Sequence, residues 1–347
     1  MWPVFSLFGP LSLSMYLHAI VFSIIFINAE GGSLSKKRPF NNSISAIFVF
    51  GDSTVDSGNN NYWKTPFKAN FPPYGMDFIN HIPTGRFTDG RLITDFLVSY
   101  VGIKECVPPY LDPTLSLEEL MTGVSFASGA SGFDPLTPTL SGAISMQKQM
   151  EYFKEYKTRV ELAIGKERTE ILINKAGFII SAGTNDFVQH FIQDLIDQGG
   201  RIIGLVGLPP LGCLPVVITL TLGSAFHNRE CIESLSSVGF DYNLKLQNTL
   251  KAMESYAYGA KIVYADIYTP VDEMIRNPTQ FGFEEVHRGC CGSGYIETTL
   301  LCNPTSHVCF DASKYVFFDS VHPTEAAYYY IFKALRPIID QVLKNYS

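Results

Sequence analysis

This chain contains a serine, an aspartate and a histidine at positions where they could form a catalytic triad. These are the three residue types of a nucleophilic hydrolase. Ser53 follows a glycine at the end of the apolar run Ala46–Phe50, and Asp319 and His322 lie one turn apart near the other end of the chain. A serine hydroxyl is a poor nucleophile until a base takes its proton, and the base needs an orienting partner. Either motif alone is more often a turn or a helix start. Together they predict Ser53 as nucleophile, His322 as base and Asp319 as its partner.

An ester hydrolase also needs hydrogen-bond donors that face the oxyanion formed during attack. Gly129 offers a backbone N–H after the run Val124–Ala127, and Asn185 offers a side-chain amide after Phe178–Ile180. Taken singly, each is more often a turn residue. Their shared position is informative, because the carboxyl ends of parallel strands meet along one edge of a sheet. We therefore expect both donors to lie on the same edge as Ser53.

Short apolar runs and amphipathic segments alternate along the chain. The expected strands are Ala46–Phe50, Val124–Ala127, Phe178–Ile180, Ile202–Val206 and Ile262–Tyr264. Helical spacing covers 93–101, 144–173, 187–196, 240–256 and 323–342. Strands alternating with helices predict an α/β fold with a central five-stranded parallel sheet and helices on both faces.

Composition narrows the class of protein. With 347 residues, 46% of them hydrophobic and 17% charged, the chain can bury one large core, so we expect a single domain over 45–347. A net charge of -7 without a basic stripe argues against nucleic acid as a partner. Neither the oligomeric state nor the identity of the substrate follows from these numbers.

The amino terminus has the pattern of a targeting segment. Residues 1–29 contain no Asp, Glu, Lys or Arg and include the apolar stretch Ala19–Ile27, which predicts a secretory signal peptide followed by a polar leader over 30–44. An uncleaved membrane anchor is the alternative, since the stretch is long enough to span a bilayer. Interruptions by Ser, Gly, Pro and His favour cleavage, after which no membrane span is expected.

Seven cysteines are typical of an oxidising compartment. Four of them, Cys290, Cys291, Cys302 and Cys309, cluster and predict a loop that is held by disulfides. Two others, Cys213 and Cys231, lie on either side of a segment rich in proline. The odd number leaves one cysteine over, and Cys106 is the candidate. A zinc site is the alternative, but two spaced Cys-x-x-Cys pairs are absent, so no metal is expected. Sequons at Asn41 and Asn345 predict a glycoprotein.

The run Phe50-Gly51-Asp52-Ser53-Thr54-Val55-Asp56-Ser57-Gly58-Asn59-Asn60-Asn61 resembles the first block of the plant GDSL esterase/lipase family, a branch of the SGNH hydrolases. The resemblance continues in order to the end of the chain through Pro83–Phe87, Phe126–Gly129, Gly183–Asp186, Gly207–Cys213, Gly289–Gly292 and Asp319–Pro323. The Gly-x-Ser-x-Gly elbow of the α/β-hydrolases is absent, which argues against that other lipase fold.

This resemblance implies a three-layer, flavodoxin-like SGNH-hydrolase fold and a secreted enzyme, in the cell wall or apoplast, that hydrolyses acyl esters of small molecules, lipids or polymers. It implies the triad Ser53, Asp319 and His322, and an oxyanion hole made by the N–H groups of Ser53 and Gly129 and the side chain of Asn185. Gly132, in the same loop, is an alternative to Gly129. No cofactor is implied.

The chain departs from the family pattern after Asn185. The segment up to Arg201 is several helical turns shorter, as if Phe187–His190 had been joined directly to Phe191–Leu195. We expect the shortening to expose core or to reshape the substrate cleft beside Asn185. Two alternatives to an ester hydrolase therefore stay open, namely an acyltransferase that uses the same acyl-serine and a family member without catalysis.

Overall fold

The computed structural model describes residues 44–134, 136–182, 185–222, 229–255, 257 and 259–345. All described residues belong to one compact unit, which lies within Phe40–Ser347. The predicted signal peptide, all but the last residue of the predicted leader, and the sequon at Asn41 lie outside the described residues. Across the described ranges, no helix is both long enough and apolar enough to cross a membrane.

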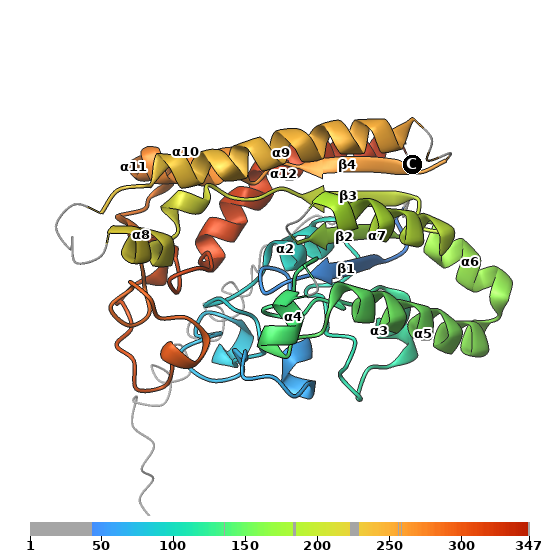
Figure 1. Ribbon diagram of the computed structural model, residues 1–347. Coiled ribbons are helices and arrows are strands. Elements are labelled where there is room, and N and C mark those ends of the chain that lie inside the picture. The colour runs from blue at the N-terminus through green and yellow to red at the C-terminus, as the bar shows by residue number, and fades with distance from the viewer. Residues whose placement is uncertain are drawn as a thin grey trace, which may run out of the picture. The chain divides into compact units, whose positions relative to one another are not determined.

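Four parallel strands form the central sheet (Figure 1). Their order is β1 (Ile47–Gly51), β2 (Gly177–Ser181), β3 (Ile202–Val206) and β4 (Lys261–Ala265). Isoleucine, valine and phenylalanine dominate the first three strands, as expected for strands buried on both faces. All four carboxyl ends therefore lie at one edge, where Gly51 pairs with Ser181 and Val206 with Ala265.

The predicted strand Val124–Ala127 is not a strand of this sheet, so the prediction of five strands was wrong. The segment runs parallel to β1, with hydrogen bonds from Val49 N to Val124 O and from Phe126 N to Val49 O, but it forms only isolated bridges at Ser125, to Val49 and to Pro109. The Asn59 amide donates to the carbonyls of Ser125 and Ala127. On the side that faces β1, the Gly51 N–H would continue the ladder to the Phe126 carbonyl, but it donates to the Gln149 side chain at 2.8 Å instead. A regular ladder therefore does not extend along the segment.

Side chains of β1 alternate between the two faces of the sheet. Phe48 and Phe50 are fully buried in the large core beneath α5 (Met146–Ile164), α7 (Asn185–Asp197) and α9 (Glu233–Glu254). Ile47 and Val49 pack on the other face, in the core that includes Val98. That face carries α2 (Ile93–Tyr100) and α12 (Glu325–Asn345).

Helix predictions are confirmed, with changes at their ends. The stretch 144–173 is two helices, α5 and α6 (Lys166–Asn174), because Gly165 with φ 88 interrupts it. α9 begins earlier than predicted, at Glu233. The remaining helices are α3 (Leu117–Met121), α4 (Leu136–Ser141), α8 (Pro215–Leu222), α10 (Tyr268–Arg276) and α11 (Pro278–Phe281), with 3-10 turns at Asn59–Tyr62, Ile79–His81, Leu211–Cys213, Thr299–Leu301 and Ala312–Lys314.

The shortened segment forms one continuous helix, α7. Its side chains Val188, Ile192 and Leu195 are fully buried, and Phe191 is 6% exposed. The joined sequence keeps apolar residues at helical spacing, so a single helix can still cover the sheet. The predicted exposure of core is not seen for the described side chains of α7.

A small parallel pair outside the main sheet was not predicted. β5 (Glu285–Gly289) pairs with β6 (Tyr315–Phe317), which ends just before Asp319. The prediction that the cysteines form disulfides is confirmed. The three disulfides are Cys213–Cys231, Cys290–Cys309 and Cys291–Cys302. Cys106 is free, as expected.

Candidate active site

Ser53 lies in the turn that leaves the carboxyl end of β1. The preceding Gly51 has φ 142, and a Cβ there would lie 2.1 Å from the carbonyl oxygen of Ser181, so only glycine fits. The Gln149 side chain clamps Gly51 by accepting its N–H and donating to its carbonyl, both at 2.8 Å. Asp52 then accepts two hydrogen bonds from Thr54, which closes the turn. These contacts hold the Ser53 hydroxyl at the edge of the sheet.

His322 connects Ser53 to Asp319, although 269 positions separate the serine from the histidine. Nε2 of His322 is 2.7 Å from Oγ of Ser53, and Nδ1 is 2.7 Å from Oδ2 of Asp319. A carboxylate accepts from Nδ1–H, which leaves Nε2 free to accept the serine proton. The structure therefore brings together all three predicted triad residues in a bonded relay.

Asp319 is fully buried and surrounded by donors. Its Oδ1 accepts the N–H groups of Val321 at 2.8 Å and His322 at 2.7 Å, so the loop folds around the carboxylate. Burial raises the pKa of Asp319, but the charge of His322 and the hydrogen bonds outweigh burial and hold the pKa below its ordinary value. Asp319 is therefore ionised at neutral pH and can stabilise an imidazolium at His322.

The predicted oxyanion donors differ in whether they already have a hydrogen-bond partner in the structure. The Ser53 N–H has no hydrogen-bond partner within the described part of the chain and is free to donate. The Gly129 N–H instead donates to Oδ2 of Asp56 at 2.8 Å, so it is engaged. The Gly132 N–H has no partner among the described groups. The side chain of Asn185 lies outside the described part, so its role stays a prediction.

Asp56 joins the loop of Ser53 to the loop of Gly129, a role that the sequence did not reveal. Its Oδ1 accepts the N–H groups of Gly58 and Asn59, both at 2.8 Å, and its side chain is fully buried. The Asn60 amide donates to the Gly129 carbonyl at 2.9 Å. The sequence marked these residues only as a polar turn, because the burial of Asp56 becomes visible only in the folded structure.

Tyr74, an aromatic residue of the loops near Ser53, covers core. Tyr74 is 1% exposed and its ring packs against Phe71, Phe87 and Phe318. Phe87 also lies 5.2 Å from the His322 ring, centroid to centroid. The contacts restrain the imidazole on its side away from solvent.

A parallel α/β sheet that presents a serine to a buried histidine and aspartate defines the site of a serine hydrolase. Comparison with known proteins gives the family. The model of the GDSL-like lipase/acylhydrolase family matches residues 47–335. The chain belongs to this family of carboxylic ester hydrolases, as the resemblance predicted.

Relatives in Arabidopsis thaliana are similar over most of their length. The GDSL esterase/lipase At5g45960 is 53% identical, with 88% of each chain covered. The GDSL esterase/lipase At2g40250 is 44% identical over 82% of this chain and 87% of its own. The GDSL esterase/lipase At1g06990 is 38% identical over 98% of both.

The alignment with At5g45960 spans 332 positions but includes only 88% of the 347 residues of this chain. Some aligned residues of the relative therefore have no counterpart here. That they fall after Asn185 stays a prediction.

Proposed function

We propose that this chain is a secreted hydrolase of carboxylic esters that carry acyl chains of the lipid type. The observation that carries the proposal is the relay of two 2.7 Å contacts from Ser53 through His322 to Asp319. The fully buried carboxylate and the nearly buried imidazole, 3% exposed, keep that relay away from competing water.

The relay supports an acyl-serine mechanism. As Ser53 Oγ bonds to the ester carbonyl carbon, its proton passes to Nε2 of His322, and the carbonyl electrons move onto the oxygen. When the carbon–oxygen bond to the alcohol breaks, Nε2 returns that proton to the departing alcohol. A water molecule then loses its proton to Nε2, attacks the acyl-serine, and Ser53 regains a proton as the acid leaves.

The oxyanion needs donors in both tetrahedral steps. The free N–H of Ser53 is the best supported of them. We propose the amide of Asn185 as a second donor. Gly129 would serve only after its N–H left Asp56, so Gly132 of the same loop is the stronger candidate for the third donor.

An apolar acyl chain is supported by the two segments beside the catalytic loop. Val216, at the start of α8, donates its N–H to the carbonyl of Ser320 at 3.0 Å. Thr219 Oγ1 donates to the Tyr295 carbonyl at 3.0 Å, so the segment 295–301 lies against α8. Both segments are therefore attached to the loop that carries Asp319 and His322.

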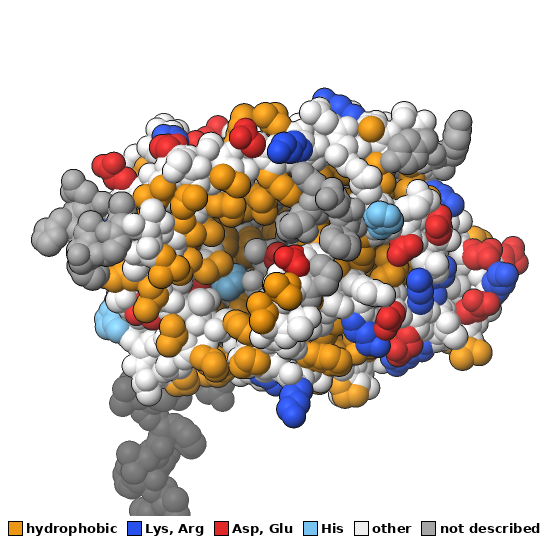
Figure 2. Space-filling view, in the orientation of Figure 1, with side chains coloured by type: hydrophobic (Ala, Val, Ile, Leu, Met, Phe, Trp, Pro, Cys, Tyr) orange, Lys and Arg blue, Asp and Glu red, His pale blue; other side chains and the backbone are white. Residues whose placement is uncertain are grey.

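These segments expose large apolar side chains and no free charge. Leu220, Leu300 and Leu301 are 76%, 58% and 55% exposed. α8 contains no charged residue, and the carboxylate of Glu297 is taken up by hydrogen bonds from Ser293 and nearby backbone N–H groups. Figure 2 shows hydrophobic side chains gathered around a hollow on one face of the molecule. Such a surface favours an uncharged, apolar substrate.

Secretion is supported by the sequence of residues 1–29 and by the three disulfides, which persist in oxidising compartments. The proposed domain is 45–347, and the proposed location is the cell wall or apoplast, as for a secreted member of a plant family. We propose no cofactor.

A fluorophosphonate probe tests the nucleophile. We expect the purified protein to be labelled and to release acid from soluble esters, and Ser53→Ala to abolish both. Ser237→Ala, at an exposed serine of α9, is the control and should keep both activities. Labelling that survives Ser53→Ala would refute the assignment. A folded but unlabelled wild-type protein would favour the non-catalytic alternative, and alcohols that outcompete water as acceptors would favour an acyltransferase.

A further inference from the structure

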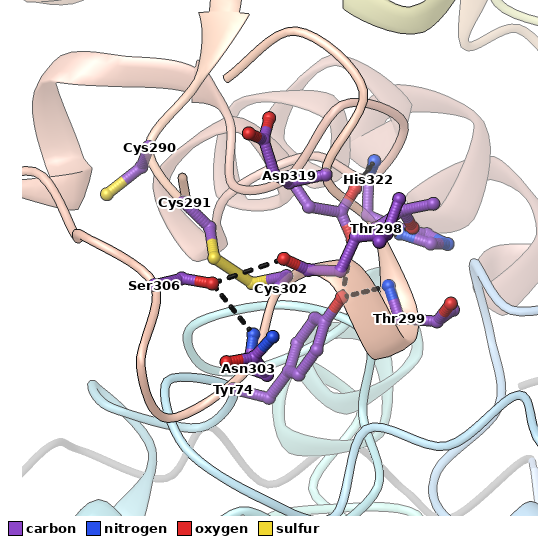
Figure 3. Close-up of a disulfide and its surroundings, with 12 residues drawn as sticks. Tyr74, Cys290, Cys291, Thr298, Thr299, Cys302, Asn303, Ser306, Asp319 and His322 are labelled. Atoms are coloured by element: carbon purple, nitrogen blue, oxygen red, sulfur yellow. Dashed lines mark hydrogen bonds and ion pairs between the residues drawn. A yellow bond between two sulfur atoms is a disulfide. The ribbon is translucent and has the colours of Figure 1, made fainter. Parts of the chain in front are cut away.

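We propose that Tyr74 and Thr298 are positioning residues for the reaction, which hold Asp319 in the orientation that His322 needs. We further propose that the Cys291–Cys302 disulfide holds the turn that supplies Thr298. This inference rests on the proposed acyl-serine mechanism and adds two residues and one disulfide to it (Figure 3).

Oδ2 is the oxygen of Asp319 that contacts the imidazole, and it has two further donors. Tyr74 donates its hydroxyl to Oδ2 at 2.8 Å, and Thr298 donates its hydroxyl at 3.1 Å. Without them, His322 at 2.7 Å would be the one donor to this oxygen among the described residues. Because the imidazole gains and loses a proton at Nε2 during the reaction, the strength of its contact with Oδ2 changes, and the two hydroxyl groups hold the carboxylate in both states.

Within the described part of the chain, Oδ2 of Asp319 is the one acceptor that the Tyr74 hydroxyl donates to, at 2.8 Å. The Tyr74 oxygen in turn accepts the N–H of Thr299 at 2.8 Å, which fixes the hydroxyl from its other side. Burial, and then the charge of Asp319, raise the pKa of Tyr74 well above its ordinary value, which keeps the proton in place. Packing on Phe87 and Phe318 fixes the ring.

The Cys291–Cys302 disulfide ties the turn that carries Thr298 and Thr299 to the segment before Asp319. The N–H of Cys302 donates to the Thr299 carbonyl at 3.0 Å, and the N–H of Cys291 donates to the Phe318 carbonyl at 2.8 Å. Both cysteines are fully buried. Figure 3 shows the disulfide beside this turn, with Tyr74 and Asp319 on either side of Thr298 and Thr299.

Donors on Oδ2 affect the reaction in two ways. They fix the carboxylate, and so the direction of the Nδ1 contact, which a hydrolase needs to keep His322 facing Ser53. They also share the negative charge of Asp319, which otherwise favours the protonated imidazole. Removing a donor should therefore slow the reaction and make His322 harder to deprotonate.

The test compares Tyr74→Phe, Thr298→Val and the double variant with the wild-type protein. The rate of fluorophosphonate labelling is measured between about pH 4 and pH 9, where a histidine titrates. We expect labelling to be about tenfold slower in Tyr74→Phe and slower again in the double variant. The acid limb of the profile should move to higher pH. Thr298→Ser, which keeps the hydroxyl, should restore the wild-type profile.

A second readout does not depend on turnover. The His322 ring is titrated by NMR in each variant, and Tyr74→Phe should raise its pKa even in a protein that the probe fails to label. Replacing Cys291 and Cys302 together by alanine should move the pKa and the acid limb in the same direction as Thr298→Val.

Tyr156→Phe is the matched control, because Tyr156 is also fully buried and loses one hydrogen bond, from its hydroxyl to the Leu120 carbonyl at 2.9 Å. It should lower stability without moving the acid limb. A folded double variant with the wild-type rate, acid limb and His322 pKa would overturn the proposal. An unlabelled wild-type protein would instead count against the proposed function.

Discussion

Gly129 donates its backbone N–H to the carboxylate of Asp56, and the distance is 2.8 Å. The same carboxylate accepts two N–H groups from the loop that follows Ser53. One buried side chain therefore sets the distance between the nucleophile loop and the glycine-rich loop. The contact also removes Gly129 from the donors that are free in this structure.

Replacing Asp56 should disturb the connection between the loop of Ser53 and the loop of Gly129. In Asp56→Asn the amide nitrogen would face the Gly129 N–H, and two donors in contact are unfavourable. We expect labelling of Ser53 to slow by about tenfold or more, because one buried donor is left without an acceptor. Asp311→Asn, at an exposed aspartate that accepts the N–H of Ser313, is the control and should label at the wild-type rate. Equal rates for all three proteins would contradict the link.

The pH dependence of stability gives a second prediction for Asp56. Burial raises its pKa from 3.8 to about 6, against the hydrogen bonds from Gly129, Gly58 and Asn59. Between these two values the folded state keeps a proton that the unfolded chain has released. The contribution of Asp56 to the free energy of unfolding therefore falls as pH rises through this window, by up to about 1.4 kcal/mol per pH unit.

Denaturant unfolding at several pH values measures this effect. The difference in unfolding free energy between the wild-type protein and Asp56→Asn should fall from pH 4 to pH 6 and then level off. A difference that rises or stays constant over that window would show that Asp56 does not hold a proton in the folded state.

The buried pair of Arg86 and Asp95 should be important for stability. Nε and Nη2 of Arg86 donate to the two Asp95 oxygens, each at 2.8 Å, and the side chains are 4% and 0% exposed. Arg86→Met would leave a buried carboxylate without its partner, which costs about 3 to 5 kcal/mol. Denaturant unfolding should show this loss.

Lys148→Met is the matched control, since Lys148 pairs with Glu151 on the exposed surface. It should leave the free energy of unfolding nearly unchanged. Adding Asp95→Asn to Arg86→Met should recover part of the loss, because it removes the unpaired charge and keeps one acceptor oxygen for the backbone N–H groups of Leu92 and Val107. A double variant less stable than Arg86→Met would contradict this explanation.

The apolar segments beside the catalytic loop should matter for long acyl chains. We expect Leu220→Asp and Leu300→Asp each to slow hydrolysis of an emulsified long-chain ester by about tenfold, since burial of one leucine is worth about 1.5 to 3 kcal/mol. Hydrolysis of a soluble short-chain ester should stay unchanged. Leu162→Asp, at a leucine of α5 that is 86% exposed, is the control. Equal losses on both esters would show that the segments act on the catalytic loop and not on the acyl chain.

Local pattern was sufficient for most of the fold. Apolar runs predicted β1 to β4, and helical spacing predicted α2, α7 and α12, because burial on a sheet or a helix face imposes a period on the sequence. The segment Val124–Ala127 has the same apolar character, yet it is no strand of the sheet. Whether its backbone joins a ladder depends on which groups compete for the facing strand, and Gln149, distant in sequence, takes the Gly51 N–H that the ladder would need.

The residues that do the proposed chemistry are readable from the chain, since Ser53, Asp319 and His322 combine a recognisable type, a recognisable neighbour and a family pattern. The residues that hold these three in place cannot be read from the chain. Tyr74 and Thr298 belong to loops without a regular period, and they reach Asp319 only because the Cys291–Cys302 disulfide and the packing of Phe87 and Phe318 bring those loops together. The direction of the Gly129 N–H likewise follows from the buried position of Asp56. Hydrogen bonds are short and directional, so partners far apart in the sequence are chosen only when the chain has folded.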